Sequence, residues 1–159
     1  MNKGFVKRRE LLMPGDLFVY PFVWSWEEVT EKPPSFKMRP VVVVQKAKDE
    51  NGYILGLVPV TTQPARDPSE RMIVPYLERA DVGMDPKRAQ SIAIRDMNIE
   101  RLTEDSNIHK MVRCWSFSST FTTKLQREFK EEFDTGLVRL CMRRPIPVEL
   151  RNDNEVTYD

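Results

Sequence analysis

The stretch SFKMRPVVVVQK, residues 35–46, decides the fold of this chain. Its four consecutive valines form an apolar run that is typical of a strand buried on both faces. Pro40 disfavours helical backbone at the residue before it, so the strand can begin at Arg39. The sequence therefore predicts a buried strand over residues 38–45, with a permanent cation at its entrance.

That cation, Arg39, has two interpretations. In the first, it is an arginine at the start of a strand that pairs with a surface carboxylate. In the second, it is part of an anion site, because a guanidinium can donate two parallel hydrogen bonds to a phosphate or a carboxylate. Ser35 and Lys37 would add a hydroxyl and a second cation on the approach to the strand.

A hairpin brings a second set of polar side chains to the same place. Asn51-Gly52 is a strong hairpin-turn signal, because both residue types readily adopt positive φ angles. The segment that follows, YILGLVPVTTQ, is the predicted second strand of the hairpin. Arg39 precedes Asn51 by 12 residues, while Thr61 follows Gly52 by 9. The two strands run antiparallel, so we expect Arg39 to lie at the same end of the sheet as the group Thr61, Thr62 and Gln63.

The rest of the chain predicts further short strands and one long helix. Apolar and β-branched runs indicate strands at 17–24, 71–76 and 111–117, a strand that runs into a turn within 90–102, and helical turns at 77–83. From Ser118 to Gly136, apolar residues recur every four positions, which indicates an amphipathic helix with its stripe in the core. The stripe comprises Phe117, Phe121, Leu125, Phe129 and Phe133. We expect a mainly β (α+β) fold, a small curled antiparallel barrel of five to six strands with a C-terminal packed helix.

Composition excludes few functions but limits the chemistry. The 159 residues carry a net charge of +1, so any polyanion site must come from local arrangement. Two cysteines, one histidine and no CxxC or HExxH motif argue against a zinc site and favour two buried thiols over one disulfide. The N-terminus lacks the apolar core of a signal peptide and no run is long enough to span a membrane, so we expect a cytoplasmic protein.

Four motifs in order carry a resemblance. PGDLFVYPF, MRPVVVVQ, LVPVTTQ and AQSIAI, followed by the helix, resemble the PemK/MazF family of toxin endoribonucleases, in a longer and diverged branch. The resemblance covers residues 14–133. It divides the chain into an N-terminal arm at 1–13, the barrel domain at 14–136, and a C-terminal extension and polar tail at 137–159.

The resemblance implies an SH3-like barrel, commonly a homodimer, that is neutralised by a cognate antitoxin and cleaves single-stranded RNA without a metal or other cofactor. Arg39 and Thr61 fall on the catalytic positions: the RNA 2′-hydroxyl would attack its own phosphorus, with Arg39 neutralising the developing charge. Expected RNA contacts are Ser35, Lys37, Thr62, Gln63, Lys87, Arg88, Gln90 and Trp26.

The sequence departs from the family at one position. An acidic residue often precedes the glutamine of the later strand, but here it is Ala89, with Asp85 and Asp96 as the nearest alternatives. A second hypothesis is therefore a non-catalytic barrel that binds RNA or a protein target, as a regulator or as a CcdB-like inhibitor.

Two further features each allow two interpretations, and a third has one. Trp24, Trp26 and Phe36 either stack on unpaired bases or pack the end of the barrel. The basic cluster KRRE at 7–10 either meets phosphates or is solvated. His109 is interpreted as a solvated histidine rather than a general base.

Overall fold

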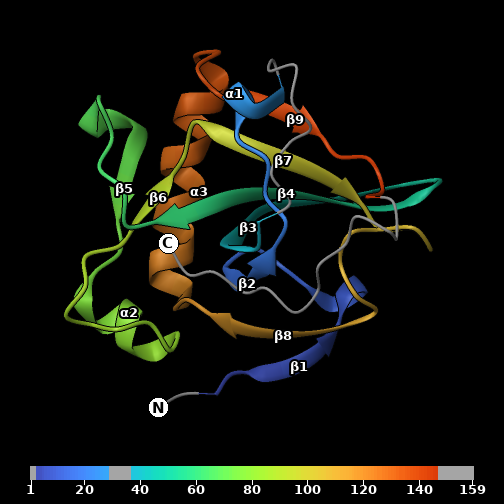
Figure 1. The fold of residues 1–159 in the computed structure, drawn as a ribbon, viewed down its shortest axis with the longest axis horizontal. Coiled ribbons are helices and arrows are strands. Elements are labelled where there is room, and N and C mark those ends of the chain that lie inside the picture. Colours follow the sequence, from blue (N-terminus) through green and yellow to red (C-terminus); the bar gives the residue numbers. More distant parts are fainter. Residues whose placement is uncertain (1–2, 29–36, 147–159) are drawn as a thin grey trace.

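The computed structural model describes residues 3–28 and 37–146 (Figure 1). The fold is mainly β, as predicted: the described residues form one sheet of nine strands, with three α-helices. The strands are β1 (Phe5–Arg8), β2 (Asp16–Tyr20), β3 (Arg39–Asp49), β4 (Gly52–Thr61), β5 (Arg71–Ile73), β6 (Ser91–Ala93), β7 (Asp96–Arg101), β8 (Met111–Ser116) and β9 (Arg139–Met142). The helices are α1 (Ser25–Glu28), α2 (Tyr76–Asp81) and α3 (Ser119–Asp134), with 3₁₀ turns η1 (Arg9–Leu11) and η2 (Pro68–Glu70).

The long hairpin β3–β4 is the centre of the sheet. The strand order is β1-β8-β2-β3-β4-β6-β5, and β7 pairs with the first half of β4 while β6 pairs with its last residues. All these pairings are antiparallel, whereas β9 joins the far side of β7 in parallel. The hairpin forms where it was predicted, but Gly52 rather than Asn51 takes the positive φ, at 108°.

The strand count differs from the predicted five to six for identifiable reasons. The predicted strand at 90–102 is interrupted after Ala93 and becomes two strands, β6 and β7. Residues expected to form an N-terminal arm supply β1, which pairs with β8, and the C-terminal extension supplies β9. The predicted strand at 17–24 ends at Tyr20, because Pro21 cannot donate a hydrogen bond to a neighbouring strand.

The valine run is buried on both faces of the sheet, as predicted. Val41, Val42, Val43 and Val44 are all 0% exposed. Successive side chains of a strand point to opposite faces. Val42 and Val44 therefore join the core beneath α3, while Val41 and Val43 join a second core on the other side. We call these sides the α3 face and the opposite face.

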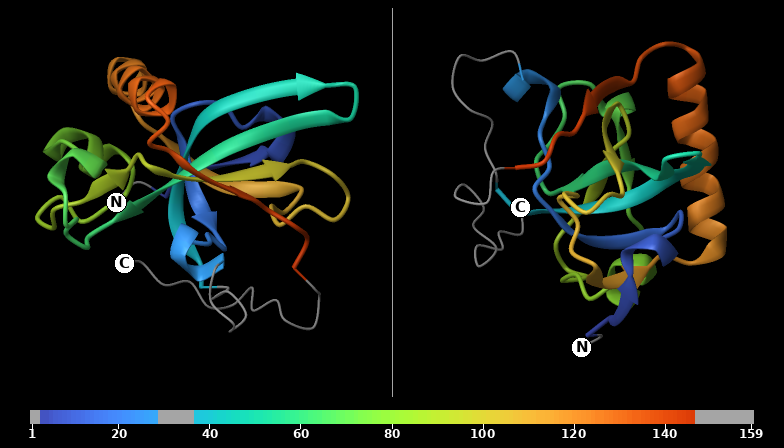
Figure 2. Two further views of the ribbon diagram at one scale, coloured as in Figure 1. Left: turned by 90° about the horizontal axis from the view of Figure 1, so that it is seen from above. Right: turned by 90° about the vertical axis from the view of Figure 1, so that its right-hand side faces the viewer.

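Helix α3 lies along one side of the sheet (Figure 2). Ser118 caps it, since its hydroxyl accepts a hydrogen bond from the backbone N–H of Phe121, and Gly136 follows its end with φ 76°. The predicted stripe is buried up to Phe129, but Phe133 is 43% exposed. A repeat of four residues drifts by about 40° per step around a helix, so the last residue turns away from the sheet.

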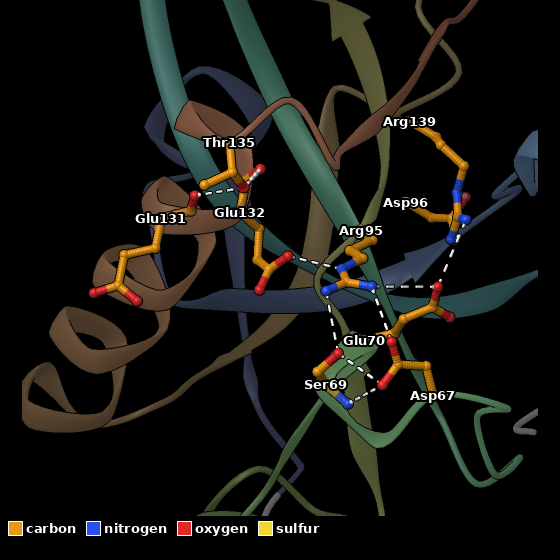
Figure 3. A network of polar contacts seen from close by, with 9 residues as sticks. All are labelled: Asp67, Ser69, Glu70, Arg95, Asp96, Glu131, Glu132, Thr135 and Arg139. Carbon is orange, nitrogen blue, oxygen red and sulfur yellow. Dashed lines mark hydrogen bonds and ion pairs between the residues drawn. The ribbon is translucent and has the colours of Figure 1, made fainter.

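An ion network joins the β6–β7 break to α3 and to the η2 loop (Figure 3). Arg95 lies 2.7 Å from Glu132 of α3, 3.4 Å from Asp67 and 3.7 Å from Glu70. Arg139 of β9 pairs with Asp96 through contacts of 3.2 and 2.8 Å. The network ties the loop before β5 to the body of the sheet.

Candidate functional site

Arg39 and Thr61 lie at the same end of the sheet, as their distances in sequence from the hairpin turn predicted. The register pairs Val41 with Pro59, and Arg39 and Thr61 each lie two residues beyond that pair, toward the same end of the sheet. Both side chains belong to the opposite face, since they share the alternation of Val41 and Pro59. The structure therefore places a guanidinium and a hydroxyl at the same end of the sheet, on the same face.

The two residues differ in exposure. Arg39 is partly buried, whereas Thr61 is only 3% exposed. The Thr61 hydroxyl oxygen accepts a hydrogen bond of 3.0 Å from the backbone N–H of Gln63, which closes the end of β4. Because that oxygen is the acceptor in this bond, the hydroxyl proton can still be donated to another group.

Trp24 is the centre of the aromatic part of the site. It is 7% exposed and stacks on Trp26, with ring centroids 4.6 Å apart and planes inclined by 14°. The guanidinium of Arg39 lies 5.9 Å from the Trp24 centroid, and that of Arg71 lies at the same distance. Of the two interpretations of the tryptophans, Trp24 packs as core and Trp26, 54% exposed, presents an aromatic surface to solvent.

The segment that carries Trp24 is held by polar groups from elsewhere in the chain. The buried side chain of Asn98, on β7, accepts from the Val23 N–H at 2.9 Å and donates to the Val23 carbonyl at 2.7 Å. The backbone N–H of Trp24 donates to Glu27 of α1 at 3.1 Å. The N–H and carbonyl of Val23, which lie outside any strand, thereby have hydrogen-bond partners. The same bonds fix the position of the adjacent Trp24.

The two adjacent threonines do not share a site. The Thr61 hydroxyl is buried and accepts from the Gln63 N–H, whereas the Thr62 hydroxyl accepts from Arg88 at 3.3 Å. Arg88 and Gln90 line a groove of about 570 Å³ against β2 and β8, with Val19, Pro40 and Trp115 among the apolar lining. The expected RNA contacts are therefore divided between the arginine–threonine end and this groove.

The other expected contacts are dispersed. Gln63 and Lys87 are exposed on loops, and Lys37 is partly buried just before β3. Ser35 and Phe36 lie outside the described residues.

A buried titratable cluster lies near the same end of the opposite face. Tyr20 pairs with Arg39 across β2 and β3, and its hydroxyl accepts from Arg143 at 3.3 Å. Burial, reinforced by the charge of Glu100, raises the pKa of Tyr20 well above its ordinary value. Burial also raises the pKa of Glu100, against the lowering effect of a 2.8 Å hydrogen bond from the Asn107 backbone.

The basic cluster at 7–10 is largely structural. Lys7 forms an ion pair of 2.6 Å with Asp16, and the buried Arg9 donates to the carbonyls of Ile108 and Thr103. Neither phosphate binding nor solvation, the two earlier interpretations, describes these contacts. Lys7 and Arg9 instead anchor β1 and η1.

Asp85 and Asp96, the acidic residues nearest to Ala89 in the sequence, differ in their surroundings. Asp96 is 2% exposed and is engaged by Arg139, while Asp85 is exposed beside the groove. His109 is exposed in the loop before β8, as expected. Cys114 and Cys141 are both buried thiols, and burial raises the pKa of Cys114 to about 11.

Arg71 is not among the site residues predicted from the sequence. It stands at the start of a short apolar strand, MIV, as Arg39 stands before the valines. A search for cations at strand entrances would have found it, but only the fold directs both arginines to Trp24.

No protein-family model matches the chain, and no curated protein is significantly similar to it. Within residues 3–28 and 37–146, no group of three or more His, Cys, Asp or Glu side chains is arranged to hold a metal ion. None of the helices in these ranges has the length and apolar character needed to cross a bilayer.

Proposed function

We propose that this protein is an endoribonuclease of the PemK/MazF type, the toxin of a type II toxin–antitoxin system, built on an SH3-like form of its curved sheet. The observation that supports it best is that Arg39 and Thr61 lie at the same end of the sheet, with Arg39 beside the stacked Trp24 and Trp26, of which Trp26 is exposed. A cation, a hydroxyl and an aromatic surface together suit the phosphate, the ribose and the base of single-stranded RNA.

In the proposed reaction, the RNA 2′-hydroxyl loses its proton to solvent and attacks the adjacent phosphorus, while the bond from phosphorus to the 5′-oxygen breaks and that oxygen takes a proton from solvent. The products are a cyclic phosphate and a 5′-hydroxyl end. Arg39 would neutralise charge on the phosphorane, and Thr61 would donate a hydrogen bond to a nonbridging oxygen. With Ala89 at the family's acidic position and Asp96 engaged by Arg139, the proposal assigns the acceleration to positioning and charge neutralisation.

The proposal includes two protein partners, a second copy of the chain and a cognate antitoxin, all acting in the cytoplasm. The groove between β2, β8 and the loop after α2 suits a protein partner, since its lining is mostly apolar. Lys3, Arg88 and Arg113 outnumber Asp85 among the charged residues of that lining, and the excess positive charge complements an acidic peptide.

The test is incubation of the purified protein with a long RNA in EDTA. We expect fragments with 5′-hydroxyl ends from the wild type, and none from Arg39→Ala. Thr61→Val, which keeps the side-chain shape but removes the hydroxyl, should lower the rate about a hundredfold. Arg127→Ala, on the exposed side of α3, is the matched control and should cleave normally. Intact RNA after incubation with folded wild-type protein would refute the nuclease proposal.

The second candidate function is a non-catalytic barrel that binds RNA or a protein target, as a regulator or a CcdB-like inhibitor. The observation that favours it is the same groove, whose apolar lining suits a protein segment better than it suits a phosphate. If this function holds, Arg39→Ala retains any inhibition of growth, while a charge introduced at Val19 in the groove abolishes it.

A further inference from the structure

Arg71 reaches the candidate site from a strand that the sequence motifs do not include. It pairs with Ala93 across β5 and β6, and Ala93 belongs to the core of the opposite face. Its guanidinium carbon lies 5.9 Å from the Trp24 centroid, as does that of Arg39. The two guanidinium groups therefore cannot be further apart than twice that distance.

The acidic groups near Arg71 are engaged by other cations. Glu70 lies 3.7 Å from both Arg95 and Arg139, and Asp96 accepts two hydrogen bonds from Arg139. These carboxylates attract Arg71 at longer range only, and burial lowers the pKa of Arg71 in spite of them. Arg71 is thus partly buried without a contacting counter-ion among the described residues.

One hydrogen-bond donor of Arg71 is also unpaired. Its Nε is buried and has no hydrogen-bond partner within residues 3–28 and 37–146. A buried charged donor without a partner is costly, and such groups are characteristic of sites that bind an oppositely charged ligand. The indole of Trp24 compensates the charge in part, through a cation–π contact.

We propose that Arg71 binds a second phosphate of single-stranded RNA, next to the one that Arg39 contacts, while the exposed Trp26 stacks on a base of the same segment. The inference rests on the proposed function, because it assigns RNA to the same site. It adds a requirement on the substrate: a segment with two neighbouring phosphates binds better than one in which either phosphate is neutral.

The test uses binding rather than cleavage. The probe is a short 2′-O-methyl RNA, which the proposed reaction cannot cut, and affinity is measured by fluorescence anisotropy over a range of salt. We expect Arg71→Met to weaken binding about tenfold, the loss of one charged hydrogen-bonding group. The slope of log affinity against log salt should fall by about 0.7, the value for one phosphate contact on a single strand. Arg66→Met, an exposed arginine on the loop before β5, is the matched control.

A second set of probes locates the phosphate. In each probe one linkage is a neutral methylphosphonate, and one such position should weaken binding to the wild type but not to Arg71→Met. A different position should show the same relation with Arg39→Met. Arg71→Lys keeps the charge and the packed stem, and should retain the salt slope but lose part of the affinity. Thermal unfolding of each variant identifies any that fail to fold.

The outcomes separate the two proposals. If Arg71→Met and Arg71→Lys bind every probe as the wild type does, the inference is wrong, whatever the cleavage assay shows. If the wild type does not bind the probe, the inference is also wrong. Binding with the expected pattern but no cleavage of ordinary RNA supports the inference and refutes the nuclease.

Discussion

Replacing Asn98 by alanine should disconnect the tryptophan segment from the sheet. Asn98 is 1% exposed and makes two hydrogen bonds, of 2.9 and 2.7 Å, to the N–H and the carbonyl of Val23. Val23 itself is 1% exposed, so water does not replace the lost partners. Each buried group left unsatisfied costs about 1–3 kcal/mol, and we expect Asn98→Ala to lower the free energy of unfolding by about 2–5 kcal/mol.

The assay is urea unfolding followed by tryptophan fluorescence and by far-ultraviolet circular dichroism. Asn51→Ala, which removes an exposed amide in the β3–β4 turn, is the control and should change the free energy of unfolding by about 0.5 kcal/mol or less. Acrylamide quenching in the absence of urea should increase for Asn98→Ala, because Trp24 loses its anchored position. A change within about 0.5 kcal/mol for Asn98→Ala, with unaltered quenching, would refute this account of the segment.

Three further predictions concern the core, a close approach and pH. Phe129→Ala should cost about 3–5 kcal/mol of unfolding free energy, whereas Phe133→Ala, at the exposed end of the stripe, should cost far less; equal losses would contradict the drift of the stripe. Gly15→Ala should destabilise by roughly 1–3 kcal/mol, since its φ is 94° and a Cβ would come within 2.3 Å of the Thr122 hydroxyl; an unchanged melting temperature would refute this. Because burial raises the pKa of Glu100, the folded state holds its proton more tightly than the unfolded state does, so stability falls as pH rises from the ordinary carboxyl pKa through the raised one. Glu100→Gln should remove that fall, and parallel stability–pH curves for wild type and variant would contradict it.

Local patterns were sufficient for the centre of the fold. The valine run and the Asn51-Gly52 turn predicted β3 and β4, and strand direction alone placed Arg39 and Thr61 at one end. Ser118 and Gly136 predicted the limits of α3 to within a few residues. These signals succeed because the forces behind them, burial of a continuous apolar run and capping of a helix, act between residues close in sequence.

Local patterns were insufficient where a strand is short and its partner distant. β1 and β9 were expected to be an arm and an ambiguous extension, because runs of four residues carry little periodicity. Both form by pairing with a strand that is distant in sequence: β1 pairs with β8, and β9 pairs with β7. Pairing of this kind depends on which edge is exposed in the folded sheet, and that is a property of the whole sheet.

The same division applies to the candidate site. Residue types and order alone predicted that an arginine and a threonine lie at the same end of the hairpin. Only the tertiary structure separated Thr61 from Thr62, fixed Trp24 through Asn98, and turned Arg71 toward the same indole as Arg39. The physical reason is that a strand specifies the alternation of its side chains, while the groups they meet come from segments that are brought together when the sheet forms.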